Sequence, residues 1–466
     1  MKAGLSVLLV IAMGFLCLSY GDPLRQNLLS PCKAFSFSVE EERELGERVF
    51  REVEKQMEVI RVPSVQDYIH GLGRRLIASA DTSPFPIRFF PLKQPEPNAF
   101  AIPGGRIFVT SGLIRLVESE DELAGVMSHE IAHVVRRHIA QRIEVSKRIT
   151  IATLAGVLAG MFVGGTEGGA ILTGSLALGE SEKLRYTREN ESEADRLGLA
   201  YVTRAGYDGR NMISFLRKIY QRTRSESAFP SYLSTHPGVP SRISYLETLM
   251  GGLPDMTGSD RSSDDLKSVQ LRLLIVDEGP LESLDHFNEL LKMRPDDADA
   301  LFGRALVQKE MGRVKESIED LKRAHVLKPA DPQILKELGY AFIRVGRVNE
   351  GVRALERSRS LSENDSETLY YLGQGYQAQK RFDLAIESYL KARELSGDPP
   401  VLDRSLGSAY KEKGEIARSH FYYGLYFKKR GMAKYARFHF EKARDLWGQD
   451  SQEREEVLRE LEQLKR

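Results

Sequence analysis

Apolar and small residues in the second half of the chain return with a period of 34 positions. Pro295 and Pro329 lie one period apart, and further positions repeat with the same spacing in four columns. The columns are Ala305, Gly339, Gly373 and Gly407; Gly312, Gly346, Lys380 and Gly414; Leu321, Leu355, Tyr389 and Tyr423; and Phe342, Tyr376 and Tyr410. A generic bundle of helices does not explain a fixed period across several columns.

This pattern resembles the tetratricopeptide repeat, whose unit is two antiparallel helices with a small residue at their contact. The resemblance implies an α-solenoid over residues 264–447, with a concave surface that binds proteins or peptides. After Gly407 the template fits again only 17 residues later, at Gly424, so we expect one helix to serve two units. Residues 251–263, rich in Gly, Pro, Ser and Asp, are the expected linker, and 448–466 a charged C-terminal helix or tail.

The first half of the chain lacks this repeat, and we expect residues 36–250 to form one domain. Residues 119–122 (Ser-Glu-Asp-Glu) have the pattern of a capping box, and apolar residues then recur at helical spacing. This predicts one helix over residues 120–143. Residues 103–105 (Pro-Gly-Gly) predict a turn between two short strands, and 106–110 an edge strand for an extended substrate.

The helix expected over residues 120–143 carries His129, Glu130 and His133 in the pattern HExxH. Histidines four residues apart stand on one face of a helix, so both imidazoles can reach one metal ion. Zinc lowers the pKa of a bound water to about 7, and Glu130 would pass the proton of that water to the leaving amine. The alternative is a chance arrangement on a helix surface, because two histidines need a third ligand to hold a catalytic zinc.

A second helix, expected over residues 187–206, offers candidates for the third ligand. Its start carries Glu189, Glu191 and Glu193, followed by Asp195. Glu191 and Asp195 are four apart, so Glu191 can complete the site while Asp195 accepts a hydrogen bond from a ligating histidine. Spacing alone leaves Glu191 and Glu193 as rivals, since an acid-rich helix start commonly compensates the helix dipole.

HExxH on one helix and ExxAD on a later one resemble the gluzincin peptidases of family M48. Two further segments are similar to elements of that family. NAFAIPGGRIFVTSGL, residues 98–113, resembles the strand–turn–strand segment before the zinc helix, and THPGVPSRI, residues 235–243, resembles the HPxxxxR element. The resemblance implies a mainly α fold, in which a helical peptidase domain with a small β-sheet precedes the α-solenoid.

The same resemblance assigns roles to individual residues of this chain. It implies one zinc ion (Zn2+) per chain, bound by His129, His133 and Glu191. It implies that Glu130 is the general base and that Asp195 is the hydrogen-bond partner of a ligand. The alignment thereby separates Glu191 from the rival acids on its helix.

Other features around the motif have a plain and a functional interpretation. The family's HPxxxxR element lies near the metal, so we expect His236 in the catalytic site, stabilising the oxyanion or covering the zinc. Arg242 is expected to support the structure or contact substrate, and His138 to pack or lie at the surface. Residues 149–179 are apolar and glycine-rich, which predicts a mobile lid, able to touch a membrane, rather than a core helix and loop.

The N-terminus begins with one lysine and an apolar run from Leu5 to Leu18, shorter than a membrane-spanning helix requires. Small residues follow, so we expect residues 1–21 to be a cleavable signal peptide. Its removal would leave Cys32 as the single cysteine, which excludes an intramolecular disulfide. The formal net charge of +1 gives no reason to expect nucleic acid as a partner.

These features together predict a zinc-dependent endopeptidase of the bacterial periplasm. The order of signal peptide, peptidase domain and repeats resembles members of the family that act on outer-membrane proteins during their assembly. The resemblance implies that the repeat domain binds outer-membrane proteins or their assembly machinery, that misassembled forms are degraded, and that the protein has a chaperone-like role. The alternative is a chaperone or scaffold with a latent peptidase site.

Overall fold

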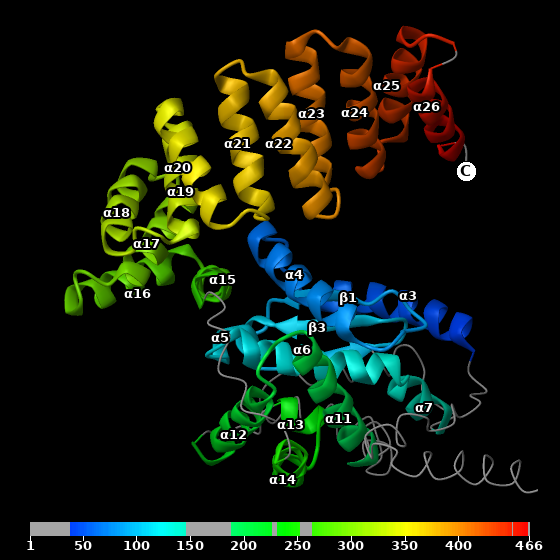
Figure 1. The fold of residues 1–466 in the computed structure, drawn as a ribbon, viewed down its shortest axis with the longest axis vertical. Coiled ribbons are helices and arrows are strands. Elements are labelled where there is room, and N and C mark those ends of the chain that lie inside the picture. Colours follow the sequence, from blue (N-terminus) through cyan, green and yellow to red (C-terminus); the bar gives the residue numbers. More distant parts are fainter. Residues whose placement is uncertain (1–37, 146–187, 226–230, 252–262, 450, 465–466) are drawn as a thin grey trace, which may run out of the picture.

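The computed structural model describes residues 38–145, 188–225, 231–251, 263–449 and 451–464. A small sheet and the helices around it form one body, and an arch of paired helices stands against one end of it (Figure 1). The expected signal peptide at 1–21, the expected lid at 149–179 and most of the expected linker lie outside the described residues. None of the described helices is long and apolar enough to cross a membrane.

The sheet of the first domain has three strands, β1 (Arg88–Leu92), β2 (Ala99–Ile102) and β3 (Arg106–Thr110), in the order β1-β3-β2. β1 runs parallel to β3, and β2 runs antiparallel to it. β3 is therefore the central strand, and the prediction that residues 106–110 form an edge strand is wrong. The reason is a non-local pairing, because β1 precedes the predicted hairpin and covers the other side of β3. On the hairpin side, the edge of the sheet belongs to β2.

The predicted turn between β2 and β3 is confirmed. Gly104 and Gly105 have φ values of 79° and 83°, a left-handed conformation that glycine adopts at little cost. A Cβ atom at Gly105 would also lie 2.8 Å from the backbone oxygen of Pro86. Both the conformation and the close contact therefore require glycine at this corner.

Helices pack on the sheet and bury a continuous apolar core between them. The helices of this domain among the described residues are α3 (Val39–Gln56), α4 (Pro63–Ser79), α5 (Ser111–Leu116), α6 (Glu120–Val135), α7 (His138–Val145), α11 (Arg188–Arg204), α12 (Arg210–Ser225), α13 (Ser231–Thr235) and α14 (Val239–Met250). Buried side chains from β1, β2, β3, α4, α6 and α11 all contribute to this core, so the helices that carry the candidate ligands are held from both sides.

α6 begins as the sequence predicts, with the Ser119 side chain accepting a hydrogen bond from the backbone N–H of Glu122 at 3.2 Å. The other half of the predicted capping box is absent, because the Glu122 carboxylate accepts from the N–H of Glu118 instead, at 2.8 Å. The helix also ends early, at Val135. Arg137 adopts a left-handed conformation with φ 54°, and α7 starts at the next residue, so the prediction of one helix over 120–143 is wrong.

α11 packs closely along α6, and Gly198 lies at the contact. A Cβ atom there would lie 3.0 Å from the backbone nitrogen of His129. α11 ends at Arg204, and Gly206 follows with a φ of 82°, a left-handed conformation that closes the helix. Thr187, the first residue of the expected helix, lies outside the described residues.

The second half of the chain folds into antiparallel helix pairs, which form the arch in Figure 1. Its helices are α15 (Ser263–Glu278), α16 (Pro280–Met293), α17 (Ala298–Glu310), α18 (Val314–Leu327), α19 (Pro332–Arg344), α20 (Val348–Leu361), α21 (Ser366–Ala378), α22 (Phe382–Leu395), α23 (Pro400–Lys413), α24 (Ile416–Lys429), α25 (Ala433–Leu446) and α26 (Gln452–Gln463). α24 packs against both α23 and α25, which agrees with the expectation that one helix serves two units.

A small residue of one helix meets a large residue of the next inside the helix pairs. A Cβ atom on Gly373 would lie 2.3 Å from the ring of Tyr389, and one on Gly424 would lie 2.5 Å from the ring of Phe440. The small residue of one helix therefore receives the large residue of the next. This contact confirms the solenoid fold.

α15 joins the first domain to the solenoid. Leu273 packs in the core of the first domain, whereas Leu271 packs in the core of the first repeats. The carboxylate of Asp277, near the end of α15, accepts hydrogen bonds from Ser111 at 2.8 Å and from Arg115 at 2.9 Å. One helix is thus part of both cores.

Farther along the joint, α4 faces α19 and the start of α21 across a polar cavity of about 510 Å³. Asp67 accepts a hydrogen bond from the Ser366 hydroxyl across this joint. Lys336, which is 1% exposed, forms ion pairs with Asp365 at 2.9 Å and Glu367 at 3.0 Å in the wall of the cavity. Burial raises the pKa of Asp67, and the charges of Asp365 and Glu367 add to that rise.

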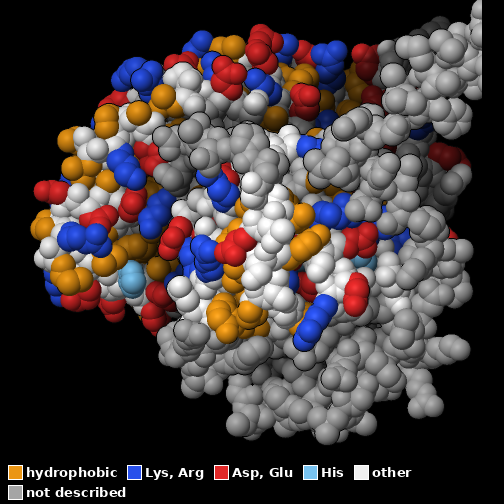
Figure 2. All heavy atoms as spheres, turned by 60° about the horizontal axis from the view of Figure 1, so that its bottom comes forward, with side chains coloured by type: hydrophobic (Ala, Val, Ile, Leu, Met, Phe, Trp, Pro, Cys, Tyr) orange, Lys and Arg blue, Asp and Glu red, His pale blue; other side chains and the backbone are white. Residues whose placement is uncertain are grey.

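On the face of the molecule shown in Figure 2, basic and acidic side chains are mixed across the described surface. Such mixing agrees with the formal net charge of +1. The described part of that face therefore carries no field of one sign.

Candidate metal centre

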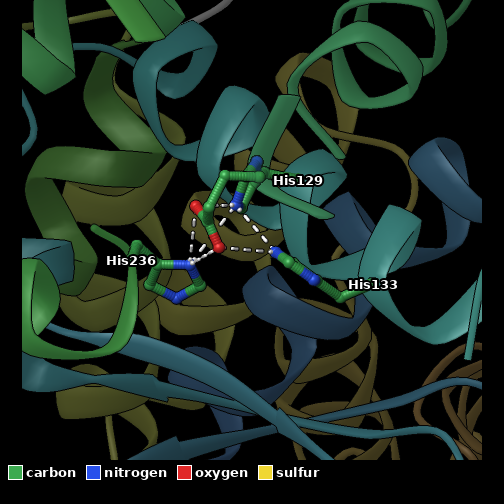
Figure 3. Close-up of side chains that lie close together, drawn as sticks. His129, His133 and His236 are labelled. Atoms are coloured by element: carbon green, nitrogen blue, oxygen red, sulfur yellow. Dashed lines mark hydrogen bonds and ion pairs between the residues drawn. The ribbon is translucent and has the colours of Figure 1, made fainter. Parts of the chain in front are cut away.

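Four side chains from three parts of the fold meet in the core of the peptidase domain. α6 supplies His129 and His133 one turn apart, α11 supplies Glu191 from its first turn, and His236 follows the end of α13. Figure 3 shows the three histidine rings turned toward one another. All four residues are buried, and one nitrogen or oxygen atom of each lies within 4.8 Å of the others.

The distances between these atoms fit a single small metal ion. The Nε2 atom of His129 lies 3.0 Å from Nε2 of His133, 3.4 Å from Nδ1 of His236 and 3.4 Å from a carboxylate oxygen of Glu191. Glu191 oxygens lie 3.5 Å from Nε2 of His133 and 3.2 Å from Nδ1 of His236. A tetrahedral zinc site with bonds of about 2.0–2.1 Å has edges of about 3.3 Å, so these atoms fit zinc in spacing and in type.

Asp195 and Arg242 hold two of these side chains in place. Asp195 lies with its Oδ1 atom 3.0 Å from Nδ1 of His129, which leaves Nε2 of that ring pointing at the cluster. Arg242, on α14, donates from Nε to Asp195 at 2.8 Å, and its Nη1 lies 2.8 Å from Glu191. One guanidinium group therefore fixes both carboxylates.

At two of the candidate ligands the electrostatics favour the protonation states that bind a metal, whereas at His129 burial is outweighed by the hydrogen bonds to Asp195 and Glu191, which raise the pKa. Burial lowers the pKa of His133 well below its usual value, with the neighbouring His129 acting in the same direction. Burial alone would raise the pKa of Glu191, but the charges of His236 and Arg242 outweigh it and hold that pKa well below the usual value. Neutral imidazole and ionised carboxylate are the forms that bind metal ions.

Glu130 lies beside this cluster without belonging to it. It is fully buried, and neither of its carboxylate oxygens has a hydrogen-bond partner among the described residues. Burial raises its pKa to about 7. Its Oε1 atom lies 3.4 Å from Nε2 of His236. A buried carboxylate with open acceptor sites next to a metal cluster is suited to bind a water and take its proton.

The structure thus brings together the residues that the sequence singled out. His129, His133, Glu191 and His236 share one point, with Glu130 beside them, and their roles in catalysis stay predictions. The rival acids lie elsewhere: Glu189 is exposed and Glu193 contacts His138.

Sequence reasoning missed two contacts at this site. Arg242 reaches the third candidate ligand directly, and its place six residues after His236 in the HPxxxxR element was the signal. His138, expected to pack or to lie at the surface, is fully buried with its Nδ1 atom 2.9 Å from Nδ1 of His133. The left-handed Arg137 turns the chain back and makes that contact possible.

The fold and the donor set define a metallopeptidase domain followed by a repeat solenoid. Residues 63–250 match the model of peptidase family M48, and residues 272–332 and 336–399 match the tetratricopeptide repeat. The chain thus contains a peptidase M48 domain followed by tetratricopeptide repeats, and both resemblances seen in the sequence are confirmed.

Curated relatives share this combination in part. The chain is 36% identical over 229 residues to a putative beta-barrel assembly-enhancing protease of Vibrio cholerae, an alignment that covers 48% of this chain and 47% of that protein. It is 32% identical over 303 residues to the beta-barrel assembly-enhancing protease of Escherichia coli, covering 64% of this chain and 62% of the relative. The chain thus spans about half to three-fifths of the length of these relatives.

A solved structure and a eukaryotic protein are also similar. A mitochondrial metalloendopeptidase of Schizosaccharomyces pombe is 27% identical over 213 residues, which covers 45% of this chain and 61% of that protein. The crystal structure of MamA aligns at a TM-score of 0.30 and 23% identity, covering 38% of this chain and 93% of its own. The repeat fold described here rests on the helix pairs of this chain.

Proposed function

We propose that the chain is a zinc-dependent endopeptidase of the bacterial periplasm. Its parts are a signal peptide (1–21), a peptidase domain (36–250), a linker (251–263), a repeat domain (264–447) and a C-terminal helix or tail (448–466). The observation that carries the proposal is the set of buried donor atoms at tetrahedral spacing with an ionisable carboxylate beside it. In this proposal His129, His133 and Glu191 hold one zinc ion, which when bound lowers the pKa of a water and polarises the substrate carbonyl.

Glu130 performs the proton transfers of the reaction. Its carboxylate accepts the proton of the attacking water and then donates it to the nitrogen of the leaving amine. The burial that raises the pKa of Glu130 to about 7 suits both steps, because the group gains and loses a proton near neutral pH. Asp195 and Arg242 keep the ligands oriented while the proton moves.

The edge of β2 is the place where an extended substrate would lie. β2 packs against α6, and the backbone oxygen of Ala99 lies 3.3 Å from Nε2 of His236. An extended peptide that adds to this edge by backbone hydrogen bonds would pass beside the metal ligands. Backbone pairing of this kind selects for unfolded segments rather than for one side chain.

His236 has two possible roles in this site. Four protein donors around one point make a closed metal site, whereas catalytic zinc sites keep a position open for water. The observed position of His236 therefore favours a covered, latent state as a second candidate function, in which the chain is mainly a chaperone or scaffold. The ring of His236 already lies beside Glu130, with Nε2 3.4 Å from Oε1, so release of its Nδ1 atom from the cluster would open the metal position and free the ring to stabilise the oxyanion.

The repeat domain is proposed to recruit protein substrates. The relatives are named for enhancing beta-barrel assembly, and tetratricopeptide solenoids bind proteins on their concave surface. We therefore propose that misassembled envelope or outer-membrane proteins, or their assembly machinery, bind there, with a possible chaperone role and no nucleic acid partner. Residues 149–179 would supply a lid and a peripheral membrane contact.

Zinc content and casein cleavage by the purified protein test this proposal. Glu130→Gln is expected to retain zinc and to lose at least about 100-fold in cleavage rate, because the proton acceptor is removed. Glu189→Gln, an exposed acid at the start of α11, is the matched control and should cleave like the wild type. If wild-type protein and His236→Ala both hold zinc and neither cleaves casein, the latent alternative is the correct one.

A further inference from the structure

The break between α6 and α7 places a second imidazole behind one of the candidate ligands. Arg137 is left-handed, so the chain turns and His138 faces back toward α6. The Nδ1 atoms of His138 and His133 are 2.9 Å apart, and both side chains are fully buried. On a continuous helix these residues, five positions apart, would point about 140° away from each other.

Two nitrogen atoms at this distance form a hydrogen bond only if one carries a hydrogen and the other a lone pair. His133 presents Nε2 to the cluster, where it lies 3.0 Å from Nε2 of His129, so a metal needs the lone pair on Nε2. The hydrogen of His133 is then on Nδ1, and Nδ1 of His138 accepts it. His138 must therefore carry its own hydrogen on Nε2.

That second hydrogen has an acceptor in the structure. Nε2 of His138 lies 3.1 Å from Oε2 of Glu193 on α11. The other oxygen of Glu193 lies 2.7 Å from Nε of Arg136, an ion pair that holds the carboxylate in place. The hydrogen bonds therefore all run in one direction: His133 donates to His138, and His138 donates to the carboxylate of Glu193.

We propose that His138 and Glu193 form a relay that orients His133 for metal binding, as Asp195 does directly for His129. This rests on the proposed function only in taking His133 as a ligand. His138 is a positioning residue in this scheme, since it acts through the outer nitrogen of His133 and offers no atom to the metal position or to a substrate. The relay also gives Glu193, a rival for the ligand position, a separate task on the same helix.

The relay predicts that its members control metal affinity rather than folding. His138→Phe keeps an aromatic ring in the buried site and removes both nitrogen atoms, and Glu193→Leu removes the terminal acceptor. Each variant is expected to bind zinc about 10–100-fold more weakly, the effect of losing an outer partner of a ligating histidine. The double variant should be no weaker than His138→Phe alone, because both act through one chain of hydrogen bonds.

Competition with a chromophoric chelator gives the zinc dissociation constant of each variant. The visible spectrum of the Co2+ form reports the geometry of the ligands. Glu189→Gln, at an exposed acid on the same helix that is not a member of the relay, should match the wild type in both readouts. His138→Gln offers an amide oxygen to the same N–H and should recover part of the affinity lost in His138→Phe.

Wild-type zinc affinity and an unchanged Co2+ spectrum in both His138→Phe and Glu193→Leu would overturn the relay and leave His138 as core packing. Glu193 is 26% exposed, so its variant keeps the test valid if the Phe variant does not fold. Failure of the wild type to bind zinc would instead contradict the proposed function itself, which distinguishes the two outcomes.

Discussion

We predict that Gly198→Ala weakens zinc binding, although the glycine contacts none of the candidate ligand atoms. An added methyl carbon would lie 3.0 Å from the backbone nitrogen of His129, 3.1 Å from its Cα and 3.3 Å from the backbone carbon of Ser128. These are backbone atoms in the middle of a buried helix, so they cannot rotate away. Only a separation of α11 from α6 relieves the contact.

The size of that separation sets the expected effect. Carbon contacts are relaxed at about 3.5–4.0 Å, so the helices must part by about 0.5–1 Å at this point. Glu191 lies seven residues before Gly198 on α11, while both candidate histidine ligands are on α6, so the shift displaces one ligand from the others. Misplacements of this size cost about 10–100-fold in affinity, or about 1.4–2.7 kcal/mol.

The same change has a smaller effect on the stability of the metal-free protein. Alanine is favoured over glycine within a helix by about 1 kcal/mol, whereas overpacking a buried contact costs about 1–3 kcal/mol. The two contributions oppose each other, so we expect the unfolding free energy to fall by about 0–2 kcal/mol. Metal affinity should therefore be the more sensitive readout.

Chelator competition for the zinc dissociation constant, beside urea unfolding without metal, is the assay. Gly71→Ala on α4 is the matched control, because its nearest neighbour is the end of the Arg75 side chain at 3.9 Å. That variant should gain about 0.5–1 kcal/mol of stability and keep the wild-type zinc affinity. If Gly198→Ala binds zinc as the wild type does and unfolds at higher urea concentration, the reasoning from close helix contact is refuted.

Two further changes test the charged groups of the fold. Arg242→Met leaves the buried carboxylates of Glu191 and Asp195 without a cation, and we expect metal-free protein to lose about 3–5 kcal/mol in urea unfolding; equal stability would contradict the network. Asp67→Asn keeps an acceptor for Ser366 but removes a carboxyl whose pKa is raised by burial in the folded state. The wild type should therefore lose stability relative to this variant as the pH rises from about 4, the pKa of the carboxyl in the unfolded chain, through its raised pKa in the folded protein. A difference in unfolding free energy between the two proteins that stays constant from about pH 4 to about pH 8 would refute this reasoning.

The solenoid was predictable because its contacts are local and repeated. Gly373 and Tyr389 lie sixteen residues apart in neighbouring helices, and the same spacing returns at Gly424 and Phe440. A contact between consecutive helices leaves its trace in a short window of sequence. The period therefore reports the packing directly.

The order of strands in the sheet was not predictable in this way. The hairpin of β2 and β3 follows from its glycine turn, but which side of β3 stays open depends on a strand that comes before it. Pairing of β1 with β3 is parallel and has no turn signal in the sequence. The sequence therefore favours residues 106–110 as the edge strand, whereas in the structure β2 lies at that edge.

The break at Arg137 was hidden for a different reason. A left-handed conformation is uncommon for arginine, and the apolar pattern continues across the break, so the sequence favours one unbroken helix. An unbroken helix would direct His138 away from His133. Residue spacing therefore predicts which side chains share one face of α6. It does not predict that the turn at Arg137 brings His138 back to His133.

The acid-rich start of α11 supplies both a candidate metal ligand and the hydrogen-bond partners of nearby histidines. Glu191 and Asp195 are four apart and share a face, where one meets the cluster and the other meets His129. Glu193 is two positions from Glu191, about 200° around the helix, and so cannot reach the same point. It meets His138 because the left-handed turn at Arg137 directs that side chain back toward α6. The three carboxylates are thus sorted by helix geometry: Asp195 contacts His129 of α6, Glu193 contacts His138 of α7, and Glu191 is able to complete the ligand set.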